Sequence, residues 1–268
     1  MKKIGKGKIL ADVKRQKKKK ESVASRYDKL KTWQPNINPN MNNHRYLPKD
    51  FIFEPLSLTA KSLYPVLCYL ADFKDPGKAF QESQANIGRM AGISNSQTVK
   101  KAITELCEAG YCKAEYIRGE RQYYVYRVEF VRIDEGTVSD KQLRKGTFYR
   151  FNTCIIESGV WAELKPRQQV FYQALRSRAV IDPDEEQAWH DLKMEMGIDH
   201  IPYKDFYAQR KHEIFMGSVP QLCEEAGMSS VNMKTTVIKP LEKYRLVKQL
   251  DAAYYSVIQV NLNPKIKG

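Results

Sequence analysis

The chain has 268 residues, of which 42% are hydrophobic and 11% aromatic, so it is long enough for two domains that each bury a core. Its apolar runs are too short to span a membrane, and its first thirty residues are too basic for a signal peptide, so we expect an intracellular protein with no membrane partner. Five cysteines without close pairing or metal-knuckle spacing favour reduced, mostly buried thiols over disulfides or zinc.

Most of the formal net charge of +14 is concentrated at the start of the chain. Residues 1–31 hold thirteen Lys or Arg against three acidic residues, a net +10, which leaves only about +4 for the remainder. We expect residues 1–43 to be a basic tail, disordered when free, that ends in a Pro/Asn-rich linker. Four lysines at its centre would bind phosphates without sequence preference; a solubilising tail and a nuclear-import signal are the alternatives. These lysines are Lys17, Lys18, Lys19 and Lys20.

Residues 44–132 show the pattern of three helices followed by a β-hairpin, which is the arrangement of a winged helix. The first helix starts near Leu58, with Thr59 as its expected cap. Pro65 falls within the apolar pattern of this helix and would shift its start or kink it. Two alternating apolar segments around a polar turn predict the hairpin over residues 112–130.

Residues 84–103 match a helix-turn-helix, in which Gly92 permits a sharp turn and Ser94 is the expected cap of the second helix. The inward stripe of the two helices consists of Ile87, Met90, Ala91, Val99, Ile103 and Leu106. The outward side of the second helix carries residue types that contact phosphates and base edges, namely Asn95, Ser96, Gln97, Thr98, Lys100, Lys101 and Thr104. At the tip of the hairpin, Arg118 and Arg121 would reach phosphate or the minor groove.

A weaker copy of this helix-turn-helix follows at an offset of 135 residues. Seven pairs within residues 83–113 are identical without a gap: Ser83/Ser218, Ala91/Ala226, Gly92/Gly227, Ser94/Ser229, Ile103/Ile238, Leu106/Leu241 and Lys113/Lys248. Most of these identities fall on the turn, cap and core positions that the motif needs. The alternative is that two unrelated helical hairpins both require a glycine turn.

A second domain is expected over residues 146–263, after a linker at residues 133–145 and before a C-terminal tail at residues 264–268. A strand opens it, and a helix from Leu164 then repeats the apolar character of the first domain's opening helix, with Pro166 in the first turn, where proline is tolerated. A short hairpin closes the domain, so a second winged helix is predicted.

Within this second domain, residues 181–215 form an acidic insert with nine acidic against four basic residues. Its aromatic residues are Trp189, Tyr203, Phe206 and Tyr207. An acidic, aromatic segment is unsuited to lie on DNA, so it is either a surface for a partner or a second copy of the chain, or a solvated helical elaboration.

The second candidate recognition helix covers residues 232–244, and Pro240 should kink or divide it. Its inward stripe is expected to consist of Met233, Val237 and Leu241. The residues expected to contact a second major groove are Ser230, Asn232, Lys234, Thr235 and Lys239.

No pattern in the chain predicts an enzyme, a cofactor or a metal site. A phosphate-binding glycine loop is absent, since the glycines at positions 5 and 7 lack its spacing and a preceding strand. The four histidines do not form a paired metal site, and the acidic residues around Pro183 are typical of a solvated turn. We therefore expect no catalytic residues.

Two segments resemble known DNA-binding proteins. Residues 58–111, with LTAK at the start, SQANI before the turn and GISNSQTVKKAITELCEAGY through the second helix, resemble the winged helix-turn-helix domains of plasmid and phage replication proteins. The segment KTTVIKPLEK at residues 234–243 is similar to the proline-containing recognition helix of tandem winged-helix plasmid replication initiators. The resemblance implies an initiator that binds repeated origin sites, exchanges between monomer and homodimer, and recruits host replication proteins.

The sequence thus predicts a mainly helical α+β protein with two winged-helix domains and a basic tail. Its expected function is sequence-specific binding of double-stranded DNA, as the replication initiator of a plasmid, phage or other mobile element. A winged-helix transcription regulator and a protein-binding winged-helix adaptor are the alternatives. The expected location is the cytoplasm, in association with the nucleoid, or the nucleus if the source is eukaryotic.

Overall fold

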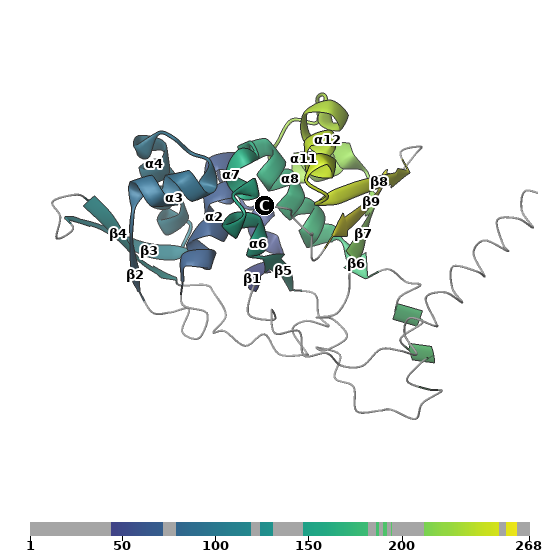
Figure 1. The fold of residues 1–268 in the computed structure, drawn as a ribbon, viewed down its shortest axis with the longest axis horizontal. Helices are drawn as coiled ribbons and strands as arrows, with labels where there is room; N and C mark the ends of the chain where they lie inside the picture. Colours follow the sequence, from purple (N-terminus) through teal and green to yellow (C-terminus); the bar gives the residue numbers. More distant parts are fainter. Residues whose placement is uncertain are drawn as a thin grey trace, which may run out of the picture. The chain divides into compact units, whose positions relative to one another are not determined.

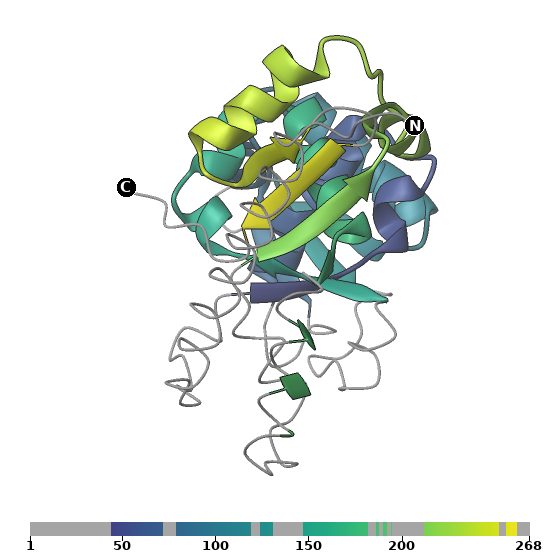
Figure 2. The same ribbon diagram turned by 90° about the vertical axis from the view of Figure 1, so that its right-hand side faces the viewer.

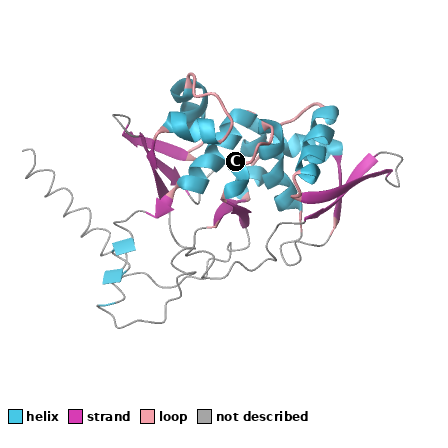
Figure 3. Ribbon diagram, turned by 180° about the vertical axis from the view of Figure 1, so that it is seen from behind, coloured by secondary structure: helices cyan, strands magenta, loops and turns pink. Residues whose placement is uncertain are grey.

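The computed structural model describes residues 44–71, 79–118, 124–130, 147–181, 186–187, 190–191, 194, 212–251 and 256–261. Residues 39–180 and 210–268 form one compact unit, and residues 1–38 and 181–209 form another. The first of these units is a mixed α+β fold with small antiparallel sheets (Figures 1 and 3). The expected basic tail, both the linker and the C-terminal tail, and most of the acidic insert lie outside the described residues.

The N-terminal half of this unit, residues 44–130, contains a helix-turn-helix followed by a hairpin. Its elements are β1 (His44–Pro48), η2 (Asp50–Phe53), α2 (Leu58–Leu70), β2 (Phe80–Ser83), α3 (Gln84–Ala91), α4 (Ser96–Glu108), β3 (Cys112–Arg118) and β4 (Tyr124–Phe130). The hairpin predicted over residues 112–130 is confirmed, and β2 joins its second strand to give the order β2-β4-β3.

The C-terminal half, residues 147–261, repeats this order of elements. It contains β5 (Phe148–Asn152), α6 (Cys154–Glu157), α7 (Val160–Glu163), α8 (Pro166–Arg178), β6 (Val180–Ile181), β7 (His212–Gly217), α11 (Val219–Glu225), the π-helical turn η3 (Lys234–Ile238), α12 (Lys239–Lys243), β8 (Val247–Asp251) and β9 (Ser256–Asn261). Here too the strand before the helix pair joins the second hairpin strand, in the order β6-β7-β9-β8 (Figure 2).

The offset of 135 residues recurs in the backbone geometry of the two halves. Gly92 and Gly227 both adopt the left-handed conformation, with φ of 73° and 71°. Ser83 and Ser218 both cap the helix that follows, because each side chain accepts a hydrogen bond from the amide three residues later. At the glycine turn, Ile93 N donates to Gly88 O, and Met228 N donates to Cys223 O, both at 2.8 Å. At the end of the second helix, Tyr111 N donates to Leu106 O at 2.9 Å, and Leu246 N donates to Leu241 O at 3.0 Å.

Helix α2 begins at Leu58, as expected, but has a different cap, and it runs unbroken through its proline. Ser57, not Thr59, is the cap, because its Oγ accepts from Ala60 N at 3.1 Å while its own backbone is extended. Pro65 cannot donate to the carbonyl of Lys61, one turn earlier. The Nε2 amide of Gln173 on α8 donates to that carbonyl at 3.0 Å, so the bond that proline removes is replaced from another helix.

One hydrophobic core runs through both halves, with α2 and α8 packed against each other between the two larger sheets (Figure 1). The strands β1 and β5 pair antiparallel and join the halves a second time. Two buried side chains also cross between them. Lys61 on α2 donates to Ala226 O at 2.8 Å, and Gln169 on α8 donates to Ala91 O at 3.1 Å. Since Ala91 and Ala226 are equivalent in the repeat, each half holds the other's helix-turn-helix at the same point.

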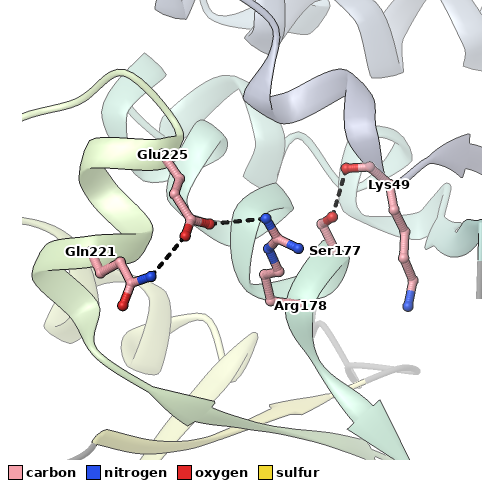
Figure 4. A network of polar contacts seen from close by, with 5 residues as sticks. All are labelled: Lys49, Ser177, Arg178, Gln221 and Glu225. Carbon is pink, nitrogen blue, oxygen red and sulfur yellow. Dashed lines mark hydrogen bonds and ion pairs between the residues drawn. The ribbon is translucent and has the colours of Figure 1, made fainter.

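The end of α8 is tied to both halves by polar contacts (Figure 4). Ser177 Oγ donates to Lys49 O at 2.6 Å, beside η2 in the N-terminal half. Arg178 Nη2 lies 3.0 Å from Glu225 Oε2 on α11, and Gln221 Nε2 donates to the other oxygen of the same carboxylate. Helix α8 therefore fixes α11 relative to the N-terminal half.

Candidate nucleic-acid interface

Helix α4 begins one residue later than the expected cap implies. Asn95, not Ser94, is the cap: its backbone is extended, and its Oδ1 accepts from Gln97 N at 2.9 Å and Thr98 N at 3.3 Å. The first turn of α4 is therefore held by a side chain that the sequence analysis assigned to DNA contact. Only the amide nitrogen side of Asn95 remains for such a contact, since its oxygen is engaged in capping.

The outward side of α4 is polar and exposed, as its periodicity predicts. We define the first polar face as Asn95, Ser96, Gln97, Thr98, Lys100, Lys101 and Thr104; all are exposed except Thr98, which is half-buried. The opposite side of the helix is buried through Val99, Ala102, Ile103 and Leu106. The predicted inward and outward positions of this helix are confirmed, although Met90 on α3 is only partly buried.

Glu105, the acidic residue that follows Thr104 on α4, binds the start of α2. The carboxylate of Glu105 accepts from the backbone N–H of Ser57 and, at 2.6 Å, from its hydroxyl. Because Ser57 caps α2, this negative charge lies at the positive end of that helix. The exposed side of α4 thus carries Lys100 and Lys101 in its middle, and an exposed acid, Glu108, at its last residue.

An open hollow of about 940 Å³ adjoins the start of the first polar face. It is lined by the start of α3, by the turn around Gly92 and by Ser96 of the first polar face. Arg89 lies at its edge, is exposed, and donates to Asn86 Oδ1 at 2.5 Å. Arg89 is not among the residues expected to contact DNA, although the helical periodicity already indicates its outward position on the first helix of the motif.

The C-terminal half carries a comparable surface. We define the second polar face as Ser230, Asn232, Lys234, Thr235 and Lys239, all of which are exposed. The predicted inward stripe of Met233, Val237 and Leu241 is buried. The helix is π-helical from Lys234 to Ile238 and α-helical from Lys239, and it continues through Pro240 without a break, so the expected division at this proline is not seen.

A clamp from α8 fixes the loop before this second helix. Arg167 Nη2 donates to the carbonyls of Ser229 and Val231, both at 2.5 Å, and approaches Met233 Sδ at 3.2 Å. Asn232 takes a positive φ of 56° in the same loop. Neither Arg167 nor Val231 was selected from the sequence, because the clamp depends on a helix more than sixty residues away.

Held in this way, Val231 presents an apolar side chain to solvent. It is 65% exposed and stands between Ser230 and Asn232 of the second polar face. At the offset of 135 it corresponds to Ser96, the first residue of α4. An exposed apolar side chain therefore adjoins the second polar face, whereas the equivalent position of the first polar face holds a serine.

Several expected contact residues lie beyond what the structure describes. Arg121 and the lysines at positions 17–20 are outside the described residues, and for Arg118 only the backbone is described, at the end of β3. The structure brings the remaining expected residues into two groups, one on each half of the compact unit.

Burial shifts the pKa values of ionisable groups within the compact unit. Lys61 is 1% exposed, and desolvation lowers its pKa. Burial likewise raises the pKa of Cys154 and Cys223 to about 11. Such groups support the scaffold that positions the faces.

The chain was also examined for metal sites, for membrane-spanning helices and for similarity to known proteins. The described residues contain no group of three or more His, Cys, Asp or Glu arranged to hold a metal ion. Over the same residues, every helix is too short or too polar to cross a membrane. No family model, no curated protein and no solved structure matches the chain.

Proposed function

We propose that the chain binds double-stranded DNA in a sequence-specific manner, through two winged helices that share one core. The observation that carries this proposal is the repeat: at an offset of 135 residues, the same glycine turn leads to a helix with a buried apolar stripe and an exposed polar, basic face. In each half a hairpin follows the helix pair, and its second strand also pairs with the strand that precedes the helices, in the orders β2-β4-β3 and β7-β9-β8. Helix, helix, helix and hairpin is the arrangement that presents one helix to a major groove.

In this proposal, α4 enters one major groove with its N-terminal end towards the bases. Gln97 carries a side-chain amide that pairs with both hydrogen-bonding groups of an adenine edge, so it would discriminate between sequences. Lys100 and Lys101 lie one turn later and would neutralise phosphates. The residues of the second polar face would make the corresponding contacts in a second groove.

The shared core supports simultaneous use of both faces. Lys61 and Gln169 connect the halves through buried hydrogen bonds, and α2 packs directly on α8. A fixed arrangement of two helices favours two half-sites at a defined spacing, because a change in spacing rotates one groove away from its helix.

The test begins with selection of bound duplexes from a random library, using the full chain. Affinity is then measured for a selected and a scrambled duplex. We expect Gln97→Ala to reduce the preference by about 1–3 kcal/mol, the value of a good base contact. Lys100→Ala should weaken both duplexes alike and lower the salt slope by about 0.9.

Lys113→Ala provides the matched control, because Lys113 is an exposed lysine on β3, outside the first polar face. It should change neither preference nor salt slope to the extent that Lys100→Ala does. Unchanged affinity in both face variants would exclude the proposed mode of binding.

A second measurement separates the body from the basic tail. Removal of residues 1–31 takes away a net +10, and we expect weaker binding with the same sequence preference. Loss of all binding after this truncation would mean that only the tail contacts DNA, and would favour a protein-binding adaptor.

We further propose that the chain is a replication initiator of a plasmid, phage or other mobile element, on the strength of the resemblance at residues 58–111 and 234–243. Homodimer formation and recruitment of host replication proteins belong to the same proposal. Repeated direct sites in an AT-rich origin would support it. A single palindrome over a promoter would instead identify a transcription regulator.

A further inference from the structure

Two cysteines meet where α4 ends and the hairpin begins. Cys107 lies in the last turn of α4 and Cys112 is the first residue of β3. Gly110 reverses the chain between them with a φ of 77°, and their Sγ atoms lie 3.5 Å apart. We propose that Cys107 and Cys112 form a reversible oxidation site, in which hydrogen peroxide converts the two thiols into a disulfide.

The five cysteines differ in their surroundings, and only this pair combines contact with access. Cys107 is half-buried, whereas Cys112 is 2% exposed. Cys68 and Cys223 are buried, and Cys154 is half-buried. An accessible thiol beside a buried one is the arrangement of an attacking and a resolving cysteine.

The ionisation of the thiols supports the same division of roles. The hydrogen bond from Cys112 lowers the pKa of Cys107 to about 7, since it stabilises the thiolate. The same bond and burial raise the pKa of Cys112. Burial raises the pKa of Cys68, and it raises those of Cys154 and Cys223 to about 11. Near neutral pH, Cys107 is therefore the cysteine with an appreciable fraction of thiolate.

The reaction balances with peroxide as the oxidant. The thiolate of Cys107 attacks one peroxide oxygen, the O–O bond breaks, and hydroxide leaves, which gives a sulfenic acid on Cys107. The sulfur of Cys112 then attacks the Cys107 sulfur, and the sulfenic oxygen leaves as water with the proton from Cys112. Two thiols and one hydrogen peroxide thus give one disulfide and two waters.

The geometry of the turn allows the two sulfurs to approach. A disulfide requires about 2 Å between them, so the pair must close by about 1.5 Å. Gly110 lies between the two cysteines, and the space beside its Cα is open, since no atom beyond its chain neighbours lies within 4 Å of the position of a Cβ there. Tyr111 anchors the other side: it is buried against Phe51 and Tyr64, with ring centroids 4.8 and 5.5 Å away.

The test uses the full chain, treated with hydrogen peroxide near neutral pH, then alkylated and digested. Cleavage after Glu108 separates Cys107 from Cys112 in the backbone. After peroxide we expect the two peptides to remain joined, with loss of two hydrogens and no alkylation, and to separate after dithiothreitol. Full alkylation of both cysteines after peroxide, or a bond from Cys112 to Cys68, would overturn the proposal.

Single variants assign the roles. In Cys112→Ser the sulfenic acid on Cys107 has no resolving thiol, so we expect it to be trapped by dimedone. Cys107→Ser should abolish the reaction at both positions, whereas Cys154→Ser, the matched control, should leave the disulfide unchanged. Circular dichroism checks folding, and the wild-type digest decides the proposal even if Cys112→Ser does not fold. If dimedone labels Cys107 and Cys154 to the same extent in this variant, the assigned roles are wrong.

The pH dependence gives an independent readout. Alkylation of wild-type Cys107 by iodoacetamide should fall as the pH drops through about 7, because the thiolate is the nucleophile. In Cys112→Ala the hydrogen bond that lowers this pKa is lost, so the midpoint should move to higher pH. An unchanged midpoint would show that Cys112 does not activate Cys107.

Discussion

At the scale of single residues, the two helix-turn-helix glycines share a conformation but differ in their surroundings. A Cβ on Gly92 would lie 2.2 Å from the carbonyl oxygen of Ala162, whereas one on Gly227 would meet only Lys61 Nζ, at 3.7 Å. Both positions have φ near 70°. The first glycine is therefore required by packing between the halves as well as by the turn, and the second by the turn alone.

This difference predicts unequal costs for the same substitution. Gly227→Ala should reduce the free energy of unfolding by about 1–2 kcal/mol, the cost of a left-handed conformation for a residue with a Cβ. Gly92→Ala should cost clearly more, because the backbone of α7 must also move. Urea denaturation of both variants measures the difference. Equal losses would show that the contact with Ala162 does not constrain the turn.

Val231 provides a residue-scale test of the second polar face that rests on the proposed DNA binding. An exposed valine among polar contact residues is suited to the methyl group of thymine in a major groove. Replacement of the thymines of the second half-site by deoxyuridine removes these methyl groups. We expect the wild type to lose about 0.8 kcal/mol per methyl contact, roughly fourfold in affinity.

The matched variants for this test are Val231→Ala and Val180→Ala. Val231→Ala should bind the thymine and deoxyuridine duplexes equally, whereas Val180, which is also exposed but lies on β6, should be replaceable without effect. If the wild type binds both duplexes equally, Val231 makes no methyl contact although the chain binds DNA.

At the scale of elements, α8 supplies hydrogen-bond donors to two helices that contain proline. Pro65 and Pro240 each lack the N–H that would bond to the carbonyl one turn earlier. Gln173 and Gln168 of α8 donate their Nε2 amides to those carbonyls, at 3.0 and 2.7 Å. Each glutamine is buried, so its amide is held where the missing backbone donor would have been needed.

A double-mutant cycle tests this relation for α2. Gln173→Ala should lower the free energy of unfolding by about 2–3 kcal/mol, because it leaves a buried carbonyl without this donor and removes packing. In a Pro65→Ala background, residue 65 regains an N–H for the carbonyl of Lys61, and the loss should be smaller by about 1 kcal/mol. Urea denaturation of the four proteins gives the coupling. A coupling of zero would show that the two groups act independently.

At the scale of the whole molecule, buried polar groups connect the two halves in addition to the shared apolar core. Gln169 is fully buried and donates to Ala91 O in one half and Trp161 O in the other. Lys61, which is 1% exposed, donates to Ala226 O across the halves at 2.8 Å, and within the C-terminal half Arg176 and Glu213 form a buried ion pair at 3.1 Å. Such groups are costly to bury unless they are paired, so they specify one arrangement of the halves.

We therefore expect the compact unit to unfold in a single transition. Gln169→Ala should lower the free energy of unfolding by about 2–4 kcal/mol, from a cavity and two carbonyls that lose their donor. Gln81→Ala, on an exposed position of β2, is the control and should have little effect. Urea denaturation followed by tryptophan fluorescence and by circular dichroism should give coincident curves. Two separated transitions would show that the halves are independently stable.

Much of the secondary structure and of both polar faces follows from local sequence patterns. The helical period placed Val99, Ile103 and Leu106 inside and left Gln97 and Lys100 outside, because burial on one side of a helix requires this spacing. The caps at Ser94 and Thr59 were wrong by one and two residues. Neighbouring Ser, Thr and Asn residues are similar as caps, and only backbone conformation selects among them.

Local sequence patterns are sufficient to predict the repeated pair of helices, the glycine turn within each pair, the buried stripes and the exposed polar residues, because each depends on neighbours within a few residues. The shared core of the two halves, the pairing of Arg167 and the glutamines of α8 with distant carbonyls, and the contact between Cys107 and Cys112 become visible only in the folded molecule. Periodicity specifies which side chains are buried, but it does not specify their partners. Those partners are fixed when elements more than sixty residues apart pack together and their buried polar groups require hydrogen bonds.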